Sequence, residues 1–205
     1  MKCHTAWSGV GALTVVLATA ALLGHGNNLS WAQRGFGPAA ARQANGAHSI
    51  IPVFGGSAMA ATVPDGSRVW GYSLALGGWK EYALPEGVTA IPVVDGGSAI
   101  GLGLRGTQIT EVAAYSNETG TWHVQRLLAP RSGSLDPRVD DDLVTYSVGG
   151  YSYAFSARRG AWDVIEGEGV AMERNHAIIV DAQANRISVF SAETGRWDTL
   201  APDAK

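Results

Sequence analysis

Four polar residues of this sequence could do chemistry if the fold brought them together. They are two carboxylates, a guanidinium group and an imidazole: Asp95, Asp140, Arg174 and His176. Groups of these types can bind a polar ligand, and closely placed carboxylates can exchange protons with a substrate. No motif around them selects a catalytic role. We therefore treat them as candidate ligand-binding residues and predict no catalytic residue.

The histidines and carboxylates lack the spacing of a metal site. None of His48, His123 and His176 has a second histidine or a cysteine at ligand spacing. The acidic run 136–142 could offer oxygen ligands to calcium, but it lacks the alternating aspartates and the glycine of a calcium loop. The sequence predicts a solvated turn there and no bound metal.

Cofactor and nucleic-acid chemistry have no support in the sequence. There is no nucleophile elbow and no phosphate-binding loop, so we predict no cofactor. The net charge is −3, and the charges are scattered rather than gathered into the basic stripe that neutralises phosphates. The sequence therefore argues against a nucleic-acid partner, and it is more typical of a binding protein than of an enzyme.

A fourfold repeat supplies the elements that must position these residues. Each copy has an aromatic residue, a serine, three variable residues, a glycine, one further residue and a tryptophan. The copies span 72–79, 115–122, 155–162 and 190–197. Successive tryptophans lie 43, 40 and 35 residues apart. A period near 40 residues with one tryptophan per unit is typical of the blades of a β-propeller.

The repeated phrase has a physical reading as a β-hairpin. The serine hydroxyl can bond a nearby backbone amide, and the glycine can adopt a positive φ in the turn. The aromatic residue and the tryptophan then face each other as a cross-strand pair. In the second unit we expect four strands, at 91–94, 98–104, 109–115 and 122–127. The predicted fold is all-β: a β-propeller with four blades of mostly four antiparallel strands.

The repeat resembles the second half of a kelch-type propeller repeat. The third unit fits best, with Val148-Gly149-Gly150 as the double glycine, followed by 151–155 and Trp162. This resemblance implies a four-bladed, kelch-like β-propeller over 49–205. Two arrangements stay open: a ring closed by packing of the first unit on the fourth, or a chain that is half of a larger assembly.

The first 48 residues predict export. Residues 1–32 resemble a signal peptide, with Lys2, an apolar run at 10–23 and the cleavage pattern Ser30-Trp31-Ala32. An uncleaved anchor is the alternative, although the apolar run is shorter than the roughly 20 residues of a membrane span. Residues 33–48 read as a flexible linker. After cleavage we expect no membrane span and a periplasmic, extracellular or envelope-associated protein.

Three functions remain open on this evidence. The first is an exported, non-catalytic binding or scaffold module whose protein or glycan ligand is unknown. The alternative is an exported enzyme that acts on carbohydrate or another polar substrate at the mouth of the propeller channel. The third is a structural partner in an envelope assembly, and a homo-oligomer is consistent with any of the three.

Overall fold

The computed structural model describes residues 50–202, and every regular element in that range is a β-strand. The predicted signal peptide, 1–32, and the predicted linker, 33–48, lie outside the described residues. The described range holds no helix of the length and hydropathy that a membrane crossing requires.

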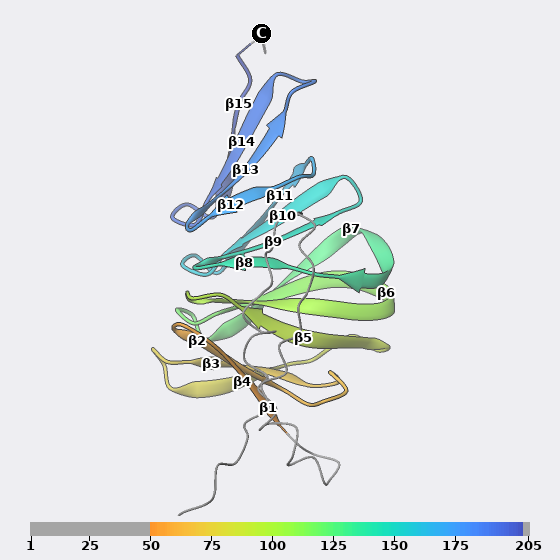
Figure 1. Cartoon of the computed structure of the whole chain (residues 1–205), viewed down its shortest axis with the longest axis vertical. Coiled ribbons are helices and arrows are strands. Elements are labelled where there is room, and N and C mark those ends of the chain that lie inside the picture. The colour runs from red at the N-terminus through yellow and green to blue at the C-terminus, as the bar shows by residue number, and fades with distance from the viewer. Residues whose placement is uncertain (1–49, 203–205) are drawn as a thin grey trace, which may run out of the picture.

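The strands form four antiparallel sheets, which we call blades 1 to 4 (Figure 1). Blade 1 contains β1 (Ile51–Gly55), β2 (Ala58–Thr62), β3 (Val69–Ser73) and β4 (Gly78–Tyr82). Blade 2 contains β5 (Val88–Val94), β6 (Ala99–Ser116) and β7 (Thr121–Leu135). Blade 3 contains β8 (Arg138–Asp140), β9 (Leu143–Val148), β10 (Tyr151–Ser156) and β11 (Ala161–Glu166). Blade 4 contains β12 (Ala171–Glu173), β13 (His176–Asp181), β14 (Arg186–Ser191) and β15 (Arg196–Leu200). The predicted all-β fold with four antiparallel blades is confirmed.

Blade 2 departs from the predicted strand pattern. The two strands expected at 98–104 and 109–115 are one continuous strand, β6, so this blade has three strands. The pairing of β6 with β7 shifts register between Gly106 and Ile109 and again between Ile109 and Glu111. These irregularities fall where β6 bends back on itself, because the Asn117 N–H beyond one end of the strand donates to the Ser98 backbone oxygen beyond the other end (2.9 Å). The two halves of β6 therefore lie close together, and the Tyr146 hydroxyl is within hydrogen-bond distance of the backbone oxygens of Leu102 and Ala113, one in each half.

The repeated phrase forms the hairpin that its residues predict. Each aromatic residue faces the tryptophan of its own unit across the last strand pair, with ring centroids 5.0 to 5.5 Å apart. The turn glycines have positive φ: Gly77, Gly120, Gly160 and Gly195. Each serine hydroxyl accepts a hydrogen bond from a backbone N–H within its own turn.

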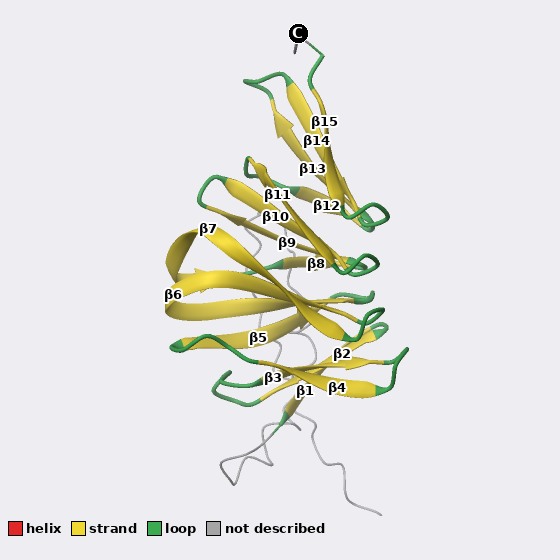
Figure 2. Ribbon diagram, turned by 180° about the vertical axis from the view of Figure 1, so that it is seen from behind, coloured by secondary structure: helices red, strands yellow, loops and turns green. Residues whose placement is uncertain are grey.

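The blades stack along the long axis of the molecule in chain order (Figures 1 and 2). Strands β2 and β5, β6 and β9, and β11 and β15 make the contacts between neighbouring blades. Blades 1 and 4 lie at opposite ends of the stack. Of the two arrangements that the sequence left open, closure by packing of the first unit on the fourth is therefore wrong for the described residues.

The core is largest where blades 2 and 3 meet. The buried Tyr146 hydroxyl of blade 3 donates a hydrogen bond to the backbone oxygen of Leu102 in blade 2 (3.0 Å) and accepts one from the Leu102 N–H (2.9 Å). Burial raises the pKa of this phenol. Because a buried hydroxyl without partners would destabilise the fold, this reciprocal pair fixes the spacing of the two blades.

A second set of polar contacts repeats at each junction between blades. The phrase serine of one blade donates its hydroxyl proton to the backbone oxygen just after the serine of the next blade. The pairs are Ser73 to Asn117 (2.8 Å), Ser116 to Ala157 (2.6 Å) and Ser156 to Ala192 (2.5 Å). The sequence predicted the role of the serine in its own turn but not this bond, which holds successive turns in line.

Candidate functional site

One end of the blade stack collects the polar turns. In a meander of four strands, the turn between the first and second strands and the turn between the third and fourth lie at the same end. Backbone hydrogen bonds join the two turns within blades 2, 3 and 4. The N–H groups of Asn117, Ala157 and Ala192 donate to the backbone oxygens of Ser98, Asp142 and Asn175, respectively (2.8 to 2.9 Å). We define the turn face as the first turns, 55–57, 95–98, 140–142 and 174–176, together with the second turns, 73–77, 116–120, 156–160 and 191–195.

All four predicted ligand-binding residues lie on the turn face, in three successive blades. Asp95 follows β5, Asp140 ends β8, Arg174 lies between β12 and β13, and His176 begins β13. The backbone N–H of Arg174 donates to the Asp140 carboxylate (2.9 Å). Asp95 and Asp140 are close enough to interact electrostatically. Three of the four therefore form a connected group.

His176 is the member that the structure does not join to this group. It pairs across strands with Glu173 and Ser191. Among the described residues, no hydrogen bond or ion pair joins its imidazole to Asp95, Asp140 or Arg174. The histidine shares the face but not the cluster.

The Asp95 carboxyl has the altered acidity that a crowded acidic turn produces. Partial burial raises its pKa above the usual value, and the nearby carboxylates of Asp140 and Asp141 raise it further. Both causes disfavour the charged form. A carboxyl of this kind holds its proton to a higher pH than an isolated aspartate, and it can donate a hydrogen bond while protonated.

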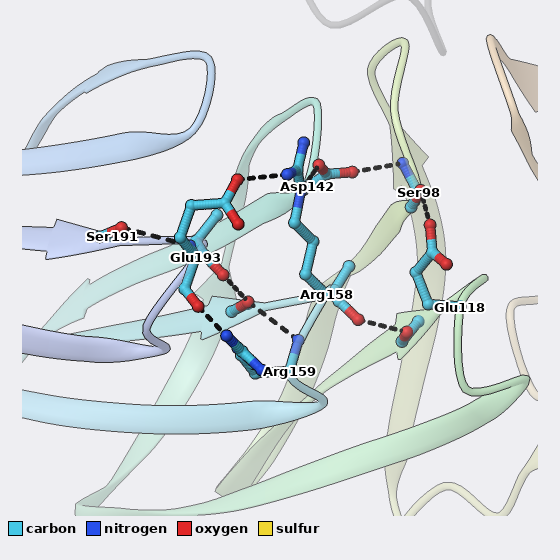
Figure 3. Close-up of polar contacts among 11 residues, drawn as sticks. Ser98, Glu118, Asp142, Arg158, Arg159, Ser191 and Glu193 are labelled. Atoms are coloured by element: carbon cyan, nitrogen blue, oxygen red, sulfur yellow. Dashed lines mark hydrogen bonds and ion pairs between the residues drawn. The ribbon is translucent and has the colours of Figure 1, made fainter.

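A chain of charged side chains that the sequence did not predict runs across the same face (Figure 3). Arg158 of blade 3 binds the Asp142 carboxylate through Nε (2.6 Å) and also pairs with Glu193 of blade 4. Asp142 in turn accepts the N–H of Ser98 (3.2 Å), whose hydroxyl donates to Glu118 of blade 2 (3.2 Å). The network therefore connects three blades.

The acidic run 136–142 is more ordered than the predicted solvated turn. Asp142 is only 8% exposed; its Oδ1 accepts the Ser98 N–H of blade 2, and its Oδ2 accepts from Arg158 within blade 3. A usable signal was present in the aligned repeats. Glu118, Arg158 and Glu193 occupy the same place in successive phrases, and their charges alternate. Alternation at equivalent positions of stacked units places opposite charges side by side.

One small concave site lies in the described residues. A pocket of about 230 Å³ lies beside blade 3 and is lined by Asp136, Arg138, Thr145, Ser147, Gly169 and Val170. This volume is below the roughly 300 Å³ at which small-molecule sites begin. Within 50–202, no three His, Cys, Asp or Glu residues lie together in a way that could hold a metal ion. The broad turn face is therefore the stronger candidate site.

Comparison with known proteins gives a distant fold likeness. No protein-family model and no curated protein matches the chain. Among solved structures, the chain is similar to several proteins at low sequence identity. They include Hsv2p of Kluyveromyces lactis (11% identity, TM-score 0.38, 75% of this chain and 61% of that one) and U3-55K (10%, 0.33, 74% and 54%). A third is a chain of the mitotic checkpoint complex (11%, 0.36, 96% and 76%).

These similarities concern the fold alone. The chain covers less than two thirds of the length of the first two structures. At identities of 10 to 11%, a shared fold carries no information on ligands.

Proposed function

We propose that this chain is an exported, kelch-like β-propeller module that binds or scaffolds a protein or glycan partner without catalysis, and that it does so through the turn face. The observation that carries the proposal is the cross-blade network of Asp142, Arg158 and Glu193. Side chains held by neighbouring blades form a polar surface with a fixed charge pattern, and such a surface favours recognition because little order has to be gained on binding.

The connected group of Asp95, Asp140 and Arg174 gives this surface both signs of charge. Carboxylates and a guanidinium group on adjacent turns suit a ligand with several hydroxyl or charged groups, whether a glycan or a polar protein surface. The surface spans the turns of successive blades, as a site for an extended partner would. These properties support binding over turnover.

The test combines one change on the turn face with a matched change elsewhere. Arg174→Glu reverses a charge on the turn face, and Arg126→Glu makes the same change on the outer strand β7. Each purified chain is applied to an array of defined glycans and, in parallel, cross-linked in the envelope fraction of its native host. We expect a reproducible partner for the wild type and for Arg126→Glu, and its loss in Arg174→Glu. Equal binding by all three chains, or no partner in either assay, would overturn the proposal.

Export has its own test. Cleavage after Ala32 would leave a mature chain that begins at Gln33. N-terminal sequencing of the protein recovered from the periplasmic or extracellular fraction should give that start. Recovery of the intact chain from the cytoplasm would contradict export.

One observation favours the enzymatic alternative, an exported enzyme acting on carbohydrate or another polar substrate. The raised pKa of Asp95 beside a second carboxylate is the pattern of a general acid. A panel of chromogenic glycosides decides between the two functions. Turnover that disappears in Asp95→Asn would establish the enzyme, whereas identical rates for wild type and variant would remove this candidate.

A further inference from the structure

The two ends of the blade stack expose apolar faces. On blade 1, one side chain from each strand forms a continuous row across the sheet: Phe54, Met59, Tyr72 and Trp79. Phe54 is 66% exposed and Trp79 47% exposed. Together these residues make a largely aromatic surface that no described residue covers.

The equivalent rows of blades 3 and 4 are interfaces with the preceding blade. They occupy the same register positions: Val139, Val144, Phe155 and Trp162 in blade 3, and Met172, Ala177, Phe190 and Trp197 in blade 4. Phe155 and Phe190 are fully buried. The row on blade 1 therefore corresponds to the surface on which a preceding blade packs in the rest of the stack.

Blade 4 exposes the other side of its sheet. In blades 1 to 3 this side packs against the following blade. The outward side chains of blade 4 include Val180, Ile187, Val189 and Leu200, which are between 37% and 65% exposed. Val189 takes the place that Gly71, Ala114 and Ala154 have in the other blades, where the next blade buries them. The two ends are thus different surfaces. The free face of blade 1 matches the side of an internal junction that contacts the preceding blade, and the free face of blade 4 matches the side that contacts the following blade.

The serine hydroxyl bond that repeats at the internal junctions is not made by the described residues at the two ends of the stack. Ser73, Ser116 and Ser156 each donate to the following blade. Among the described residues, Ser191 has no such acceptor. By the repeat, its acceptor would be the backbone oxygen of Leu74, the residue after Ser73. Leu74 lies at the exposed edge of blade 1 and is 55% exposed.

The repeat tryptophans make a second set of contacts between blades, each with the preceding blade. Trp122 and Trp162 donate Nε1–H to the backbone oxygens of Lys80 and His123 in the preceding blade (2.9 and 3.0 Å). At the third junction the carboxylate of Asp163 accepts the backbone N–H of Trp197 instead (2.8 Å). Asp198 holds the position of Asp163 on the free face of blade 4, and Trp79 holds that of Trp197 on blade 1. Each end therefore supplies the partner that the other needs.

We propose that the outer face of blade 4 packs on the outer face of blade 1 of a second copy of this chain, head to tail, and that two such junctions close two copies into one ring of eight blades. A junction between unlike surfaces repeats until the rotation closes. Eight blades lie within the range that propellers use. This interface lies on the sheet faces at the ends of the stack, and the partner-binding surface proposed above lies on the turns.

At one position the proposed junction carries a larger side chain than the internal junctions do, because Val189 replaces Gly71, Ala114 or Ala154. Gly71 leaves room for the Tyr115 ring of the next blade, because a Cβ at that position would come within 2.6 Å of the ring. Val189 offers two methyl groups to Tyr72 at the equivalent place. We therefore expect the copies to associate reversibly and with a dependence on concentration.

Cysteine cross-linking tests the geometry directly. Leu74→Cys and Ser191→Cys are made as single variants and as a double variant, all with Cys3→Ser to remove the remaining thiol. Head-to-tail packing predicts that the two single variants link only when mixed and that the double variant links between chains. Cross-linking of a single variant to itself would indicate a symmetric interface, and a link within one chain would indicate closure of four blades. Either result overturns the proposal.

Mass in solution tests the number of copies. Sedimentation equilibrium of the full chain should give twice the chain mass at high concentration. Phe54→Glu should raise the dissociation constant at least about tenfold, the effect of losing one central apolar anchor. Leu128→Glu, which changes an equally exposed residue (62%) away from both end faces, should leave it unchanged. A strict monomer at all concentrations, or an open series of higher multiples, would contradict the two-copy ring.

Discussion

Ser156 uses one hydroxyl group for two structural tasks. The oxygen accepts the N–H of Arg159 in its own turn (3.1 Å), and the hydroxyl proton goes to the backbone oxygen of Ala192 in the next blade (2.5 Å). The residue is fully buried. A serine chosen for its turn therefore also fixes the distance between blades, and this makes it more costly to replace than an exposed turn serine.

Ser156→Ala should lower the free energy of unfolding by about 1–3 kcal/mol, because it leaves a buried backbone oxygen without its donor. Ser67→Ala is the matched control, since the Ser67 hydroxyl bonds only the neighbouring Asp65 at the surface. Urea unfolding of both variants gives the comparison. Equal losses would mean that the bond to Ala192 contributes nothing beyond the turn.

The Asp95 carboxyl predicts a pH dependence with a definite sign. Its pKa in the folded state lies above the unfolded value, so folding binds protons there. The corresponding stability is fully present below the unfolded pKa of about 3.8 and is lost as pH rises through the folded pKa. Asp95→Asn should therefore be more stable than wild type at pH 7, and this advantage should disappear near pH 3. Thermal unfolding across that range measures it, and a constant difference between the two proteins would contradict the cause given for the shift.

At the scale of elements, the turn glycines show which hairpins are packed by a neighbour. Gly77 and Gly195 have almost the same φ, 68° and 67°. A Cβ at Gly77 would meet nothing within 4 Å, whereas at Gly195 it would come within 3.2 Å of Arg159 in blade 3. The turn glycine is thus open in blade 1, on whose free side no described blade lies, and packed against the preceding blade in blade 4.

Gly77→Val and Gly195→Val separate backbone strain from packing between blades. Both should lose stability through a positive φ that valine tolerates poorly, a cost of about 1–3 kcal/mol. Gly195→Val should lose more, because Arg159 has to move and its bond from Nε to the Glu193 backbone oxygen (2.6 Å) is disturbed. Chemical denaturation of both variants tests this. A smaller loss at Gly195 would argue against close contact of the turns.

At the scale of the whole molecule, the end blades of an open stack should be less stable than the central blades. Each blade contacts only its neighbours, so blades 2 and 3 are stabilised on two sides and blades 1 and 4 on one. The largest buried cluster consists mostly of residues of blades 2 and 3, with Val69 and Tyr82 from blade 1. Local opening should therefore begin at the ends.

Hydrogen exchange followed by mass spectrometry should show this gradient. Amides of β13 and β14 should exchange faster than those of β9 and β10, measured in Phe54→Glu to keep separate copies apart. In the wild type at high concentration, head-to-tail association should slow exchange in blades 1 and 4 selectively. Uniform protection along the stack would contradict the one-sided packing of the end blades.

The sequence by itself determined the local hairpin and its repetition. The aromatic pair, the turn serine and the turn glycine act within eight residues, so their spacing alone predicts their contacts, and all four hairpins formed as expected. Asp95, Asp140, Arg174 and His176 were candidate ligand-binding residues by their chemical types, and the sequence did not place them relative to one another. The structure then showed that three of them form a connected group.

Only the tertiary structure decided what happens between units. The bond of Ser98 to Asp142, the pair of Arg158 with Glu193 and the open ends of the stack all depend on how one blade sits on the next. Residues about 40 positions apart meet there, and their contacts depend on sheet twist and spacing, which no local pattern encodes. The repeat determined the blade, and packing between blades determined the stack, its polar turn face and its two unlike ends.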